Sequence, residues 1–135
     1  MRAFITVVLL SITLFALDIE VYTDYNRALN EAKYSKKVLL IYLYQEGCST
    51  CTYMDQEVFT DKKVETYINN YYTVLHVKSY TVSLPKRFYA DMSPVFHFVN
   101  PEDGSMIESI IGGRNPNAFL SKLQKSYLEY KDDIN

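Results

Sequence analysis

The chain has 135 residues, of which 48% are hydrophobic and 22% charged, and its net charge at pH 7 is −2. This length suits one domain with a single core, and the balance of apolar and charged residues excludes a disordered chain. The sequence also lacks the excess of basic residues that a nucleic-acid surface needs, so we expect no nucleic-acid partner.

The first 17 residues differ in composition from the rest of the chain. After Arg2, residues 3–17 carry no charge. This apolar stretch is shorter than the roughly 20 residues of a membrane span, but it suits a secretory signal that follows a positive charge. We therefore expect residues 1–17 to be a signal peptide or a retained N-terminal anchor, with a buried core helix as the alternative. Contact with a membrane is expected only if the segment is retained.

Residues 18–135 are expected to form the domain, and their first half alternates between helix and strand patterns. Residues 22–37 have apolar side chains at helical spacing, with Asp24 positioned to cap the helix. Residues 38–44 form an apolar run typical of a strand buried on both faces. Residues 49–70 have helical spacing again, with a break at Thr60-Asp61 that divides them into two segments.

The second half begins with a predicted strand at 71–77 and a short helix at 84–90. Two further strands, 94–99 and 105–111, flank a turn and are expected to form a hairpin. The last helix, 115–130, opens with an asparagine cap and a proline. Its apolar positions are Phe119, Leu120, Leu123 and Leu128.

The order of these elements predicts an α/β fold. Strands that alternate with helices are connected by crossovers and lie parallel, whereas the final hairpin is antiparallel. We therefore expect one mixed central sheet with helices on both faces.

Both cysteines of the chain lie in the segment "EGCSTC", two residues apart, as Cys48 and Cys51. One interpretation is a structural disulfide. A bridge across so short a loop stabilises a fold by about 2 kcal/mol at most and joins residues that a helix already holds together. This interpretation therefore explains little.

A metal site is the second interpretation. Zinc needs four ligands, and His76 and His97 are not spaced as in a zinc finger. Each histidine lies within an apolar strand pattern, where a hydrogen-bonded structural role is the usual one. Binding of a soft ion such as Cu(I) by the two thiolates alone stays open as an alternative.

A redox couple is the third interpretation, and it accounts for the position of the cysteines as well as their spacing. The buried strand ends at Tyr44, a short turn follows, and Cys48 begins a helix. Unpaired backbone N–H groups at such a position favour a thiolate. Cys51, one turn later, can attack a mixed disulfide formed at Cys48.

On these motifs the chain resembles the thioredoxin superfamily over about residues 20–130. It is similar above all to its exported members and to the C-terminal thioredoxin-like domain of transmembrane thiol:disulfide interchange proteins. The resemblance rests on "VLLIYLYQEGCSTC", "MDQEVFTDKKVETYINNYY", "FYADMSPVFHFVNPEDG" and "IIGG". It implies that Cys48 attacks and Cys51 resolves. It also implies a cis-proline at Pro94 and a substrate-binding segment that includes Met92 and Ser93.

The sequence departs from the family pattern at two positions. Gly47 stands where a tryptophan usually precedes the first cysteine, and Tyr42 stands where many thioredoxins carry a buried acid. Asp55, four residues after Cys51, is on the same helical face and could take the proton of the resolving thiol instead.

These features together predict an exported thiol:disulfide oxidoreductase that reduces protein disulfides and faces the bacterial periplasm. Its partners would be protein disulfide or dithiol substrates and a thiol electron donor. We expect a monomer without a cofactor other than the cysteine pair. A disulfide donor or isomerase and a copper-binding chaperone are the alternatives.

Overall fold

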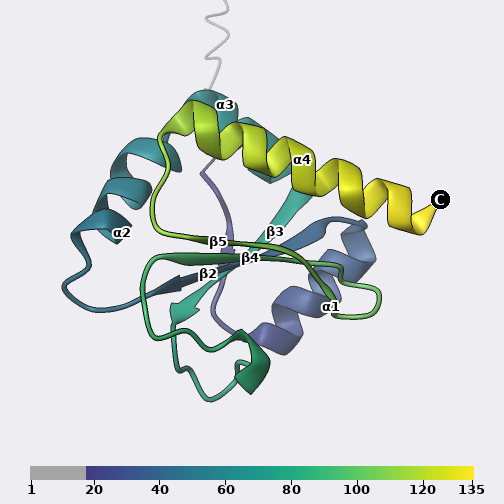
Figure 1. The fold of residues 1–135 in the computed structure, drawn as a ribbon. Coiled ribbons are helices and arrows are strands. Elements are labelled where there is room, and N and C mark those ends of the chain that lie inside the picture. The colour runs from purple at the N-terminus through teal and green to yellow at the C-terminus, as the bar shows by residue number, and fades with distance from the viewer. Residues whose placement is uncertain (1–17) are drawn as a thin grey trace, which may run out of the picture.

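A computed structural model of the protein describes residues 18–135 as one mixed five-stranded sheet with helices on both faces (Figure 1). The strands are β1 (Val21–Tyr22), β2 (Val38–Tyr44), β3 (Tyr72–Lys78), β4 (Val95–Val99) and β5 (Met106–Ile111). The α-helices are α1 (Tyr25–Ser35), α2 (Ser49–Tyr53), α3 (Lys62–Tyr71) and α4 (Pro116–Ile134). A π-helical turn, η1 (Met54–Val58), continues α2, and a 3-10 turn, η2 (Lys86–Phe88), precedes β4.

The sheet has the order β1-β3-β2-β4-β5, and β2 lies at its centre. β3 runs parallel to both β1 and β2, whereas β4 is antiparallel to β2 and to β5. β2 is buried along its length as far as Leu43, as expected for a strand covered on both faces. The predicted fold class and the C-terminal hairpin are thus confirmed.

Two hydrophobic cores lie on opposite faces of the sheet. In the view of Figure 1, α3 and α4 lie above the sheet and α1 lies below it. Alternate residues of β2 enter different cores: Leu40 and Tyr42 pack in the upper core, whereas Leu39 and Ile41 pack in the lower one. The period-two alternation of a strand therefore divides the molecule into two halves with separate packing.

The predicted N-cap of the first helix, Asp24, is confirmed, but the short strand before it was not predicted. Val21 and Tyr22 form β1, which pairs with β3 at the edge of the sheet. The helix begins at Tyr25, after Asp24 accepts a hydrogen bond from the backbone N–H of Arg27. A two-residue strand is too short to show a period, which explains why the pattern gave no sign of it.

The other helices differ from prediction in detail. The predicted break before the second part of 49–70 is confirmed, because Asp61 caps α3 through the N–H groups of Lys63 and Val64. Leu128, expected on the apolar face of α4, is 61% exposed. The helix instead buries Phe119, Leu123, Ser126 and Tyr130.

No helix among residues 18–135 is long and apolar enough to cross a membrane. The predicted signal peptide or anchor, residues 1–17, lies outside the described residues.

Candidate redox site

The two cysteines lie where β2 leads into α2. Cys48 is the N-cap of the helix, and its Sγ accepts a hydrogen bond from the backbone N–H of Cys51 at 3.1 Å. The carbonyl of Cys48 already accepts from the N–H of Thr52, so the first turn is closed around the sulfur. A sulfur that replaces the usual capping oxygen is held in contact with a backbone donor, which stabilises a thiolate.

The cysteine pair is in the disulfide form, with the two Cα atoms 5.2 Å apart. Cys51 is only 5% exposed, whereas Cys48 is partly exposed. A large disulfide substrate can therefore approach Cys48 much more easily than Cys51.

Gly47, in the position of the usual family tryptophan, has a left-handed backbone with φ of +73°. A Cβ atom built there would meet nothing within 4 Å. Glycine is thus required by the backbone conformation of the turn and not by a lack of space.

The helix that carries the cysteines is fastened to the turn after β5. The backbone N–H of Arg114 donates to the sulfur of Met54 at 3.4 Å. A Cβ atom on Gly113 would lie 2.7 Å from Cγ2 of Thr50, so a larger residue would force at least the Thr50 side chain to move. The glycine allows the close approach.

Tyr42 and Asp55 meet directly behind Cys51. The Tyr42 hydroxyl donates to Oδ1 of Asp55 at 2.9 Å and lies 3.2 Å from the carbonyl oxygen of Cys51. Burial, and then the charge and hydrogen bond of Asp55, raise the pKa of Tyr42 far above its ordinary value. Tyr42 is therefore a permanent donor that orients the carboxylate. Tyr42 thus stands where many thioredoxins carry a buried acid. It orients a different acid, Asp55, which the following helix supplies.

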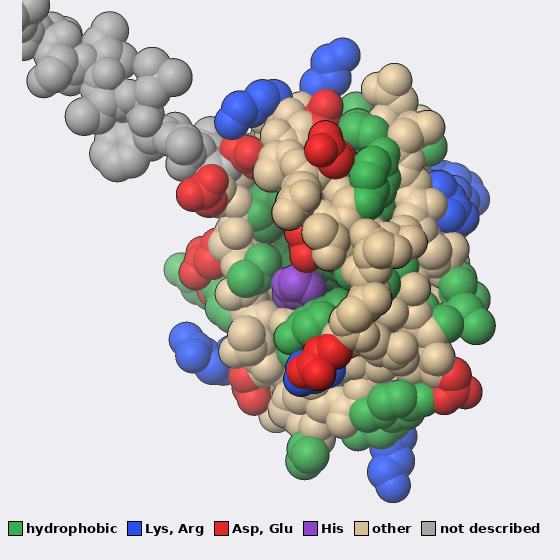
Figure 2. Space-filling view, turned by 90° about the vertical axis from the view of Figure 1, so that its left-hand side faces the viewer, with side chains coloured by type: hydrophobic (Ala, Val, Ile, Leu, Met, Phe, Trp, Pro, Cys, Tyr) green, Lys and Arg blue, Asp and Glu red, His purple; other side chains and the backbone are tan. Residues whose placement is uncertain are grey.

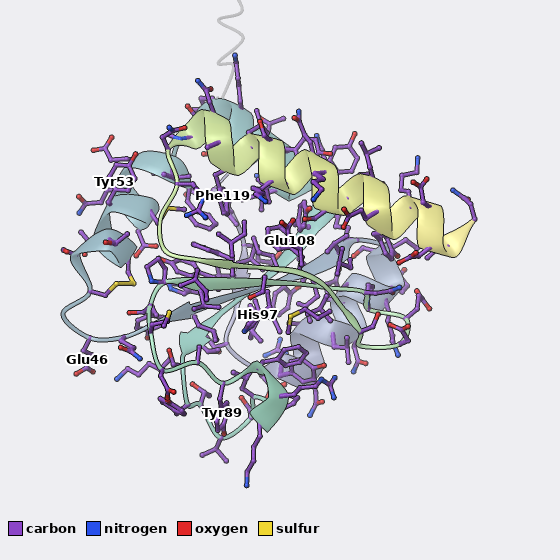
Figure 3. The ribbon with its side chains drawn as sticks, in the orientation of Figure 1. Glu46, Tyr53, Tyr89, His97, Glu108 and Phe119 are labelled. Atoms are coloured by element: carbon purple, nitrogen blue, oxygen red, sulfur yellow. A yellow bond between two sulfur atoms is a disulfide. The ribbon has the colours of Figure 1, made fainter. Side chains whose placement is uncertain are left out.

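Glu46, two residues before Cys48, brings a second carboxylate close to the cysteines along the chain. Its carboxylate forms an ion pair with Lys78 of β3, which the parallel register brings next to Tyr44 at the end of β2. The hydrogen bond and the charge of Lys78 lower the pKa of Glu46. Figure 3 shows Glu46 on the outer side of the loop before α2. Lys78 was missed because it is remote in sequence.

The segment that contains Met92, Ser93 and Pro94 leads into β4. The Ser93–Pro94 peptide bond is cis, and Met92 is 49% exposed. The pairing of Val95 with Leu43 places Pro94 next to the end of β2, from which the chain continues to Cys48. The segment and the cysteine pair therefore lie at the same end of the sheet.

The two histidines have different environments. His97 is buried, with Nε2 3.0 Å from the carbonyl oxygen of Phe88 and Nδ1 2.9 Å from the hydroxyl of Ser109. The hydrogen-bonded structural role predicted for it is confirmed. For His76 this prediction is wrong at one nitrogen, because Nε2 is buried without a hydrogen-bond partner among residues 18–135. Within that part of the chain, no group of three or more Cys, His, Asp or Glu could hold a metal ion.

A CxxC pair at the start of a helix that follows a central parallel strand defines a thiol–disulfide oxidoreductase. The chain belongs to the thioredoxin-like family, whose model matches residues 20–101. None of the curated proteins matches it significantly in sequence.

Solved structures share the fold. A thioredoxin from Thermus thermophilus has a TM-score of 0.68 at 24% identity, with 80% of this chain and 86% of that chain covered. The oxidised C-terminal domain of DsbD from Neisseria meningitidis gives 0.63 at 16% identity, with 79% and 99% covered. A DsbH oxidoreductase gives 0.62 at 15% identity, with 82% and 85% covered. At these identities the likeness concerns the fold.

Proposed function

We propose that this protein is an exported reductase of protein disulfides, with Cys48 as the attacking thiol and Cys51 as the resolving thiol. One observation carries the assignment of roles: Cys48 is accessible and accepts a backbone hydrogen bond, whereas Cys51 is 5% exposed. The accessible sulfur can meet a client, and the buried one can meet only its neighbour.

The reaction has two exchanges. The Cys48 thiolate attacks one sulfur of the client disulfide, forms a mixed disulfide and releases the other client sulfur as a thiolate. Cys51 then loses its proton and attacks Cys48 Sγ, which re-forms the disulfide and releases the second client thiolate. The client is reduced by two electrons and the cysteine pair is oxidised. A thiol electron donor then reduces the pair again.

Asp55 is proposed to accept the proton of Cys51. Cys51, Cys48 and Asp55 line one hollow, and Tyr42 holds one oxygen of the carboxylate. The same negative charge disfavours a thiolate and so favours the disulfide, which makes the dithiol a reductant. Glu46 adds less to this effect than its place in the sequence implies, because Lys78 offsets its charge.

Met92, Ser93 and Pro94 are proposed to bind the client backbone next to Cys48. Their place beside the end of β2 and the exposure of Met92 support this role. Export to the bacterial periplasm and a monomeric state complete the proposal. Export is supported by the composition of residues 1–17 and by the resemblance to exported family members.

Trapping of mixed disulfides tests the roles of the two cysteines. Cys51→Ser should accumulate covalent complexes with insulin or other disulfide clients, because the second exchange cannot occur. Cys48→Ser is the matched control and should form none. Equal trapping by both variants would contradict the assignment.

Equilibration of the wild-type pair with glutathione buffers tests the direction. We expect a reduction potential nearer to about −270 mV than to about −120 mV, the values of a reducing and a strongly oxidising member of the superfamily. A potential above about −160 mV would make the protein a disulfide donor.

A further inference from the structure

His76 lies directly beside Tyr42, because the parallel register of β2 and β3 pairs these two residues. Their rings stack with centroids 4.2 Å apart and 10° between the planes. Nε2 of His76 has no hydrogen-bond partner among the described residues. Buried polar atoms in proteins almost always have a hydrogen-bond partner, from the protein or from ordered water. The space beside the ring is therefore where a partner for this nitrogen has to lie.

A cavity of about 240 Å³ lies next to His76, bounded by η1, β2 and β3. Its polar lining consists of His76, Tyr42, Asp55, Thr60, Glu65 and Asp18. Figure 2 looks onto the end of the molecule that carries α2 and shows a histidine side chain in a hollow with acidic side chains near it. The volume and the polar lining suit several water molecules.

Asp55 connects this cavity with the cysteines. The hollow of about 360 Å³ that contains Cys48 and Cys51 is lined by Asp55 as well. Asp55 thus borders both spaces, with its orientation held by the Tyr42 hydroxyl. A carboxylate in this position can take a proton on the cysteine side and release it on the histidine side.

We propose that His76 is a proton relay for Cys51, which acts through Asp55 and the water of the cavity between them. This inference rests on the proposed reductase function. When Cys51 resolves the mixed disulfide, its S–H bond breaks, its electron pair forms the bond to Cys48 Sγ, and the client sulfur leaves as a thiolate. The proton passes to Asp55 and then to the nitrogen of the imidazole that carries no hydrogen. It returns by the same route when the electron donor reduces the pair.

The charges around the ring suit this role. The rings of Tyr42 and Tyr44 of β2 contact His76, and Asp55 of η1 acts on it electrostatically. Glu65 of α3 and Asp18 before β1 line the same cavity. Burial lowers the pKa of His76, and the charge of Asp55 raises it in part. The ring is therefore a neutral base in neutral solution, and the Asp55 carboxylate stabilises the imidazolium while it holds the proton. His76 is a positioning residue in this scheme, since it does not touch the sulfur atoms.

Stopped-flow reaction of the reduced protein with 5,5′-dithiobis(2-nitrobenzoate) separates the two exchanges. The first coloured thiolate reports attack by Cys48, and the second reports resolution by Cys51. In His76→Gln we expect the second phase to slow by at least about 10-fold and to lose part of its pH dependence. The first phase should stay within about twofold, because Cys48 does not use the relay.

His97→Gln is the matched control. It removes a buried histidine that is hydrogen-bonded at both nitrogens and lines neither space. This variant should be less stable to heat but should keep the wild-type second phase. If His76→Gln does not fold, His76→Phe retains a ring against Tyr42 and carries the same expectation.

Chemical rescue distinguishes a proton relay from a ring that only fills space. Imidazole added to His76→Ala should restore the second phase, whereas 1,2,4-triazole, of the same size but far less basic, should not. An unchanged second phase in His76→Gln, or equal rescue by the two compounds, would overturn the relay. Release of only one equivalent of the coloured thiolate by the wild-type protein would instead overturn the proposed reductase function, so the two failures can be told apart.

Discussion

The two faces of the central sheet differ in the hydrogen bonding of their polar side chains. On the face covered by α1, β2 contributes only aliphatic side chains, and the one histidine, His97, is hydrogen-bonded at both nitrogens. On the face covered by α3 and α4, Tyr42 and His76 stack on each other, and a cavity lies beside them. Figure 3 shows His97 and Glu108 on opposite sides of the sheet, which helps to locate the two faces.

The face below the sheet therefore serves mainly stability, and the face above it lies next to the redox site. Close packing and full hydrogen bonding stabilise the face below the sheet. The face above it contains an imidazole nitrogen that no described residue hydrogen-bonds, and a cavity with a polar lining. These features are found next to the cysteine pair, where a proton must move. The buried side-chain nitrogen that the described residues leave without a partner thus lies beside the redox site.

The largest effect is expected for Ile41→Ala on the face below. Ile41 is fully buried among aliphatic side chains, so the substitution should lower the free energy of unfolding by about 2–5 kcal/mol. Denaturant titration measures this loss. The rate at which Cys48 of the folded protein reacts with iodoacetamide should not change. If that rate changed several-fold, the two faces would not be as independent as their packing indicates.

Most of the fold could be predicted from the sequence because its elements are long enough to show a period. β2 and α4 are marked by an apolar run and by a cap followed by a proline. β1 and η1 were not predicted. A two-residue strand has no period, and a π-turn depends on the hydrogen bond from Phe59 to Met54 and not on composition.

The candidate site could be predicted only as far as neighbours in the sequence allow. Cys48, Cys51 and Asp55 lie in one helical segment, so their proximity follows from helical spacing. His76 and Lys78 reach the site through the register of β3 against β2, which pairs them with Tyr42 and Tyr44. Register depends on packing of the whole sheet, so these two contributions could not be seen in the sequence alone.

A moderate effect is expected for Tyr42→Phe, the neighbour of Ile41 on the opposite face. The ring still stacks on His76, but the hydroxyl that holds Asp55 is lost. One such hydrogen bond contributes about 1 kcal/mol, so stability should fall by about that amount. If this hydrogen bond stabilises the transition state of the Cys51 step by the same amount, its loss should slow that step by about fivefold. A stability loss without any change in the second phase of the two-phase thiol assay would show that the hydroxyl is only structural.

The smallest effect is expected in the titration of the two histidines. Burial lowers the pKa of both rings below the ordinary value of about 6.5, but only His76 is also affected by Asp55, whose charge raises its pKa in part. A ring with a lowered pKa in the folded state binds its proton more readily once the protein unfolds. Each therefore contributes stability above about pH 6.5 that is lost as the pH falls from there through the folded pKa.

In Asp55→Asn the pKa of His76 should decrease further, and that of His97 should stay unchanged. Proton NMR of the two Cε1–H signals measures both values in one sample, and His97 serves as the internal control. Equal movement of the two signals would mean that Asp55 acts through the whole fold, and the distinction between the faces would not hold.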